Sequence, residues 1–79
     1  MKLWLLKPVE NADPWIQFHD CMFGFVVRAD SEAVARSIAA TSAGDEGPKA
    51  WLSAQNSTCE ELQAAGQPGV ILEAWNRPK

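Results

Sequence analysis

The sequence predicts a small α+β domain: a four-stranded, mainly antiparallel sheet with one main helix on one face and a second short helix, in the order β-β-α-β-α-β. Three observations support this fold class. The 79 residues suffice for one compact domain, 1–79, that buries roughly 60% of the surface of its unfolded chain. The composition, 47% hydrophobic and 22% charged, is typical of a globular domain. Apolar runs of strand length alternate with turns that contain Gly or Pro, and one central stretch has the signals of a helix.

The first part of the chain predicts two strands joined by a packed loop. Residues 2–7 are mostly apolar, and Pro8 ends this first strand. Residues 8–20 contain two prolines and several large apolar side chains, so we expect a loop that packs on the core, with one helical turn after Pro14. Residues 22–29 form the second strand. Period-two spacing places four of its side chains on one face: Phe23, Phe25, Val27 and Ala29.

A helix is predicted to follow at once and to continue to about Ser42. Asp30 and Ser31 are both good N-cap residues, and Glu32 lies where the positive end of the helix dipole favours a carboxylate. Gly44 suits the left-handed residue that follows a helix C-terminus. Helical spacing predicts that one stripe faces the sheet (Val34, Ala35, Ile38, Ala39 and Ser42), with Arg36 and Ser37 turned to solvent.

The remaining elements are shorter. Residues 44–48 form a polar turn, and 49–53 are expected as the third strand. Residues 57–62 contain two overlapping capping boxes and predict the second, short helix, which ends near Gly66. Residues 70–75 are apolar and predict the last strand.

Charge and the N-terminal residues exclude several classes of function. The net charge is -3, from 7 basic and 10 acidic residues, so we expect no direct binding to nucleic acid. No apolar run approaches the ~20 residues of a membrane span. Lys7 interrupts the first apolar run, and no cleavage site follows it, so we expect a cytoplasmic protein. Thiols are kept reduced there, and we expect Cys21 and Cys59 to be reduced and mostly buried.

Residues with chemical potential do not form a recognisable motif. His19, Cys21 and Cys59 are ligand types that suit zinc, but neighbours in an extended segment point to opposite sides and a fourth ligand is lacking. Cys59 lies at the start of the second predicted helix, where a thiol pKa can fall, which leaves a thiol protein as an alternative. We expect no catalytic activity, no metal and no cofactor, because no acid, base and nucleophile converge.

Acidic residues on two loops form the first candidate for partner binding. Asp45 and Glu46 lie before the predicted third strand, and Glu60 and Glu61 lie after it. Together they predict an acidic face that docks on a basic protein surface. The alternative is that they only cap helices and face water.

An excess of apolar side chains forms the second candidate. One helix covers one face of the sheet, which is expected to carry Leu3 and Leu5 with the second-strand side chains. Strict alternation places the following on the opposite face: Trp4, Leu6, Val26, Ile71 and Trp75. The 8–20 loop covers that face, with Trp15 and Phe18, or else a partner or a second copy of the chain does. Trp4 and Trp75 are therefore the apolar candidates for partner contact.

Several segments are similar to short uncharacterised proteins of proteobacterial genomes and prophages. These segments are MKLWLLKPVENADPW, FGFVVRADSEAVAR, AGDEGPKAWLS, STCEEL and PGVILEAW, and they span nearly the whole chain. The resemblance implies a mobile-element setting and an inhibitor of a host defence complex, as anti-CRISPR proteins are. The implied partner is a host protein or ribonucleoprotein complex with a basic surface. The alternative is a small homo-oligomeric accessory protein that pairs through its second sheet face.

Overall fold

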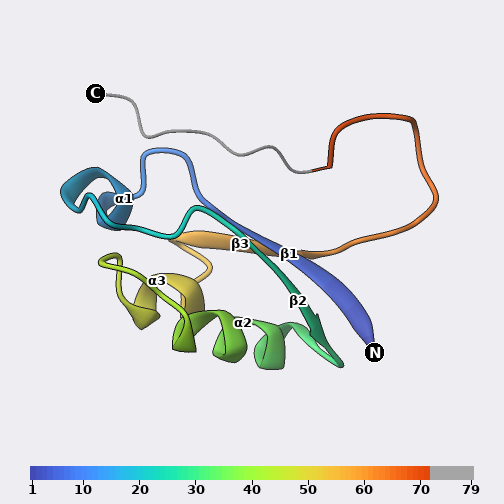
Figure 1. Ribbon diagram of the computed structural model, residues 1–79, viewed down its shortest axis with the longest axis horizontal. Coiled ribbons are helices and arrows are strands. Elements are labelled where there is room, and N and C mark those ends of the chain that lie inside the picture. Colours follow the sequence, from blue (N-terminus) through green and yellow to red (C-terminus); the bar gives the residue numbers. More distant parts are fainter. Residues whose placement is uncertain (72–79) are drawn as a thin grey trace.

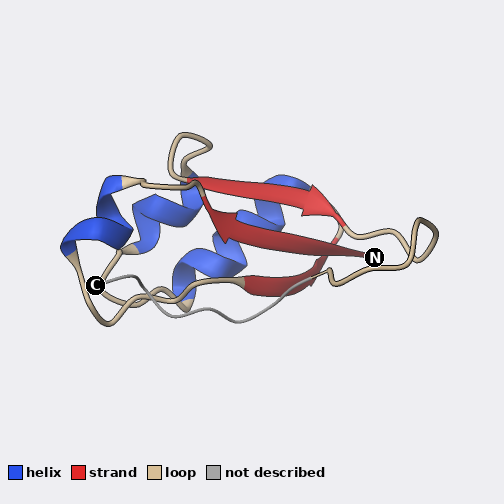
Figure 2. Ribbon diagram, turned by 90° about the horizontal axis from the view of Figure 1, so that it is seen from above, coloured by secondary structure: helices blue, strands red, loops and turns tan. Residues whose placement is uncertain are grey.

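A three-stranded antiparallel sheet forms the upper layer of the computed structural model, which describes residues 1–71. Its strands are β1 (Lys2–Pro8), β2 (Phe25–Ala29) and β3 (Ser57–Glu61), and β1 lies in the centre in the order β2-β1-β3 (Figure 2). The α+β class is therefore confirmed. The described residues hold three strands rather than four.

Two of the helices lie below this sheet, and the first helix of the chain lies beyond one end of the strands (Figure 1). The helices of the described residues are α1 (Asp13–Gln17), α2 (Glu32–Thr41) and α3 (Pro48–Leu52). The helical turn expected after Pro14 is confirmed by α1, and the bounds expected for the main helix match α2 closely. The Ser31 hydroxyl accepts a hydrogen bond from the Val34 amide at 3.3 Å, as expected of an N-cap.

The core between the layers is centred on Trp51, which is fully buried. Its ring makes edge-on contacts with Trp15 at 5.1 Å and with Phe25 at 4.8 Å between ring centroids. Leu6 and Val27 project into the same cluster from the sheet. Small side chains on α2 let the helix approach the strands closely.

The face expected for β1 is wrong. Trp4 pairs with Val27 in the register of β1 and β2, so both side chains lie on the helical side. Leu5 and Val26, which also pair, lie on the opposite face. Alternation within each strand was correct, but the relative register of two strands depends on the loop between them, which the sequence pattern does not determine.

A strand was expected over 49–53 and a helix over 57–62, but the first segment forms a helix and the second forms a strand. Residues 48–52 form α3: Pro48 occupies the first turn, where its missing N–H costs nothing, and Gly47 precedes it at a φ of 84°. Residues 57–61 form β3, because pairing with the open edge of β1 outweighs the local capping signals. The strand expected over 70–75 falls largely outside the described residues, and Val70 and Ile71 belong to no strand.

The main helix is rotated relative to its expected orientation. Its buried residues are Ala35, Arg36 and Ala39, whereas Val34 and Ile38 are 47% and 44% exposed. The expected inner stripe was therefore correct for Ala35 and Ala39 and wrong for Val34, Ile38 and Ser42, which is also exposed. The physical reason is Arg36, whose side chain is bonded inside the fold.

Candidate protein-binding surface

Arg36 joins α2 to α3 and β3 in the interior. Its Nη1 donates to the Trp51 carbonyl and to the Ser57 hydroxyl, both at 2.9 Å, and its Nη2 donates to the Ser57 carbonyl at 3.1 Å. Its Nε donates to Glu32 at 2.9 Å, one helical turn earlier. Four donated bonds use four of the five N–H groups of a guanidinium that is only 8% exposed. This network fixes the rotation of α2 and turns Val34 and Ile38 outward.

Glu46 is a buried structural residue and not part of a docking loop. It is 6% exposed, and its carboxylate accepts hydrogen bonds from the backbone amides of Met22 and Gly44 and from the indole N–H of Trp51. The carboxylate therefore ties the loop before α3 to the segment before β2 and to the central ring of the core. The expectation that Glu46 faces a partner is unsupported by this burial.

The other candidate acids do not gather into one patch. Asp45 is exposed on the loop between α2 and α3, while Glu60 and Glu61 lie near the end of β3, away from that loop (Figure 1). Glu61 forms an exposed ion pair with Lys2 at 3.6 Å. Such pairs contribute little to stability or binding. An acidic face built from both loops is therefore not present in this arrangement.

Of the two candidate tryptophans, Trp4 is half-buried against the core. Its indole N–H donates to the Ala29 carbonyl at 2.9 Å, so both its ring and its polar atom have partners within the fold. Trp75 lies outside the described residues.

The cysteines and His19 are not brought together as a site. Cys21 is half-buried beside α1, where its Sγ lies 3.5 Å from the Phe18 carbonyl, while Cys59 is a half-buried thiol on β3. Burial, together with the nearby Glu32 carboxylate, raises the pKa of Cys59 above its ordinary value. The lowered pKa considered for a reactive Cys59 is therefore wrong. Within residues 1–71, no group of three His, Cys, Asp or Glu side chains is placed to hold a metal ion.

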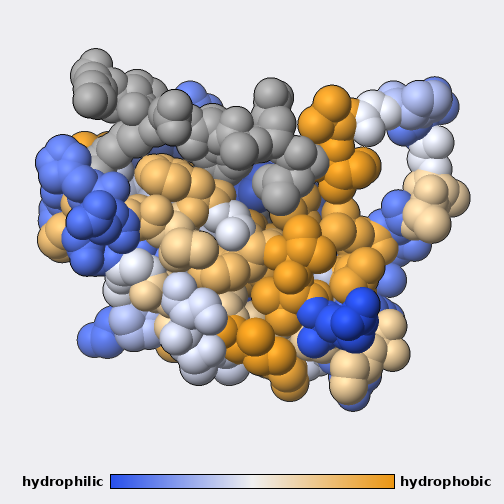
Figure 3. Space-filling view, in the orientation of Figure 1, coloured by the Kyte–Doolittle hydropathy of each residue, from blue (hydrophilic) through white to orange (hydrophobic). Residues whose placement is uncertain are grey.

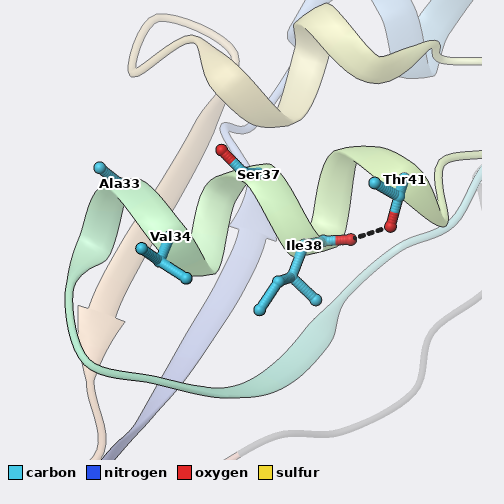
Figure 4. Close-up of a pocket in the computed structure, with 5 residues that line it drawn as sticks. All are labelled: Ala33, Val34, Ser37, Ile38 and Thr41. Carbon is cyan, nitrogen blue, oxygen red and sulfur yellow. Dashed lines mark hydrogen bonds between the residues drawn. The ribbon is translucent and has the colours of Figure 1, made fainter.

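A surface without charged side chains follows the outer side of α2, next to the edge strand β2, and we call it the β2–α2 flank. It consists of Val26 of β2, whose side chain lies on the face of the sheet turned away from the helices, and of Ala33, Val34, Ser37, Ile38 and Thr41 on α2. The last five line a shallow groove of about 360 Å³ (Figure 4). Val34 and Ile38 extend from the same side of the helix, and Val26 of the edge strand is 51% exposed. Figure 3 shows hydrophobic side chains gathered over β2 and α2 on the face turned to the viewer.

The groove offers few groups that prefer water. The Thr41 hydroxyl donates to the Ile38 carbonyl within the helix at 2.6 Å, and none of the six flank residues is charged. Sequence periodicity missed this surface because it placed Val34 and Ile38 in the core. Part of the signal was present: Ala35 and Ala39, the small residues of the expected stripe, do face the sheet, and Arg36 is buried beside them in place of Val34 and Ile38.

A second hollow lies on the opposite face of the sheet. It is about 310 Å³ in volume and lies between β1, β3 and the segment that follows β3. Leu5 forms its floor, but Lys7, Glu60 and Glu61 also line it. Its mixed charge distinguishes it from the neutral β2–α2 flank.

Comparison with known proteins adds no relative: no protein-family model, curated protein or solved structure matches the chain. In the described part of the chain, the helices are all too short and too polar to cross a membrane.

Proposed function

We propose that the chain is a non-enzymatic protein-binding module and that it contacts its partner through the β2–α2 flank. The observation that carries this proposal is the exposure of Val34 and Ile38 beside each other on the uncharged outer side of α2. Apolar side chains of this size are normally buried, and their grouping on one side of a small domain is typical of an interaction site.

The polar groups of the interior support a binding role rather than catalysis. Glu46 and Arg36 are the most buried charged side chains, and their oxygen and nitrogen atoms bond to backbone and side-chain groups of the fold. A carboxylate and a guanidinium held in this way stabilise the packing of α2 and α3. The inhibitory role expected from the resemblance to prophage proteins is part of this proposal, and that resemblance alone supports it.

Site-specific photo-crosslinking in living cells tests the proposal. A benzophenone amino acid replaces Ser37 within the flank, and the matched control carries it at Gln55, an exposed residue between α3 and β3. We expect a covalent adduct with another polypeptide chain from position 37 and none from position 55. Equal labelling from both positions, or no adduct from position 37, would show that the flank is only solvent-exposed surface.

A further inference from the structure

The edge strand β2 presents unpaired backbone groups beside the flank. The Leu3 carbonyl accepts from the Leu62 amide and the Val9 amide donates to the Asn56 carbonyl, so odd-numbered residues of β1 bond toward β3. In an antiparallel sheet the alternate residues bond to the other neighbour, so even-numbered residues of β1 bond to Phe25, Val27 and Ala29. The amides and carbonyls of Val26 and Arg28 therefore point away from the sheet. Among the described residues no strand lies beyond them.

The other edge of the sheet is less suited to pairing. The outward carbonyl of Ser57, at the start of β3, already accepts a hydrogen bond from Arg36. Two carboxylates, those of Glu60 and Glu61, end this strand. Charge on an edge strand is a common device against association with another strand. The β2 edge carries one charged side chain, that of Arg28, and its outward amides and carbonyls bond to no other strand among the described residues.

We infer that the partner of the β2–α2 flank is a second copy of this chain, paired through β2 in an antiparallel, two-fold arrangement. The inference rests on the proposed function, because it names the partner of the same surface. A two-fold axis perpendicular to the sheet joins the two sheets into one of six strands and keeps both helical layers on the same side. Val34 and Ile38 point from α2 toward β2, whereas Ser37 points to the side of α3 (Figure 4), so Val34 and Ile38 of the two copies face each other across the axis.

Charge excludes one register of the pairing. An axis through Arg28 would place two guanidinium groups directly opposite each other, which is unfavourable. An axis through Val27 pairs Val26 with Arg28 of the second copy, and an axis through Val26 pairs Val26 with its own copy. In both of these registers the outward Val26 amide donates to a carbonyl of the second copy, and the Val26 carbonyl accepts from an amide of it. Because the helical flank is uncharged, bringing two copies of it together costs no repulsion.

Analytical ultracentrifugation of the purified full chain over a range of concentrations tests the inference. We expect the mass to rise from the 8.7 kDa of one chain to twice that value and no further. Val26→Pro removes an outward amide that makes no bond within the sheet, and an edge strand tolerates proline at such a position. We expect it to weaken dimerisation at least about tenfold, since two-fold symmetry repeats each lost bond. The matched control is Glu61→Pro, which removes an outward amide on the β3 edge.

A second variant keeps the test valid if Val26→Pro fails to fold. Ile38→Lys places a charge on the exposed flank and should also weaken the dimer, whereas Gln55→Lys should not. A chain that stays monomeric at millimolar concentration overturns the inference, as does a dimer that neither flank variant weakens. Growth beyond the dimer would indicate head-to-tail pairing of β2 with β3 and would also overturn it. If the chain is monomeric yet still crosslinks to a different protein through position 37, the proposed function stands and only this inference fails.

Discussion

Replacement of Arg36 by Ala is expected to remove a large part of the stability of the fold. The substitution deletes the donors to the Trp51 carbonyl, the Ser57 carbonyl and the Ser57 hydroxyl, all of which are buried. The Trp51 carbonyl keeps a hydrogen bond from the Ser57 hydroxyl at 3.3 Å. The Ser57 carbonyl is therefore the acceptor that the substitution affects most. A hydrogen bond to a charged group contributes about 1.5–3 kcal/mol, so losing the three buried bonds together should cost about 3–5 kcal/mol. A domain of this length has a free energy of unfolding of roughly 4–12 kcal/mol in total.

Urea denaturation followed by tryptophan fluorescence measures the effect. With a slope near ~1 kcal/mol per molar urea, the midpoint should fall by about 3 M or more. Arg36→Lys keeps the charge but loses the planar fork, so it should lie between the wild type and Arg36→Ala. It also provides a measurable variant if Arg36→Ala is unfolded.

Two exposed neighbours on α2 serve as controls for this prediction. Ser37→Ala should change the free energy of unfolding by less than about 0.5 kcal/mol. Ile38→Ala should cost less than Arg36→Ala, about 1 kcal/mol, because nearly half of the Ile38 side chain is already in water. If Ile38→Ala is the more costly change, or if Arg36→Ala is nearly neutral, the rotation of α2 described above is incorrect.

Three further predictions follow from the loops and from β3. Gly44→Ala should destabilise the fold by about 1–3 kcal/mol in urea denaturation, because its Cβ would lie 2.3 Å from a backbone oxygen; Gly69→Ala, with nothing within 4 Å, should be within about 0.5 kcal/mol of wild type. Glu46→Gln should cost about 2 kcal/mol and change the near-ultraviolet circular dichroism, since one acceptor oxygen becomes a donor; an unchanged spectrum would contradict this. Maleimide labelling against pH should show the pKa of Cys59 above its ordinary value of 9.0 and lowered again by Glu32→Gln. Because the pKa of Cys59 is higher in the folded chain than in the unfolded chain, the free energy of unfolding should fall as pH rises from 9.0 through the folded-state pKa. Cys59→Ser should abolish this dependence.

Local sequence patterns predicted the elements that local physics decides. The apolar run of β1 and the aromatic and β-branched run of β2 were recognised as strands, and Ser31 marked the start of α2. The left-handed conformation expected of Gly44 is wrong: α2 ends at Thr41 with Ser42 as its C-cap, and Gly44 has no positive φ. The packed loop with a helical turn was also foreseen, because Trp15 has too large an apolar ring to remain in water, and it is buried. The face was wrong, since Trp15 packs on Trp51 in the core on the helical side of the sheet, and Phe18 is exposed. Each of these features depends on residues that are close in sequence.

The features that the sequence did not predict depend on contacts between residues that are distant along the chain. The donors to Glu46 include the amide of Met22, 24 residues away, and Arg36 bonds to Ser57, 21 residues away. Neither pair leaves a mark in the spacing of the sequence. Residues 49–53 and 57–62 are too short for periodicity to separate helix from strand, although Gly47 followed by Pro48 is a helix-start signal that outweighed the apolar run.

The most direct measurement of the central claim is the concentration dependence of backbone amide signals in nuclear magnetic resonance spectra of the ¹⁵N-labelled chain. If the β2–α2 flank is the associating surface, the amides of Val26, Arg28 and Ile38 shift as the protein is concentrated, while those of Thr58 and Glu60, which bond to β1, stay constant. Shifts that appear along β3 instead, or none along β2 and α2 at any concentration, would contradict it.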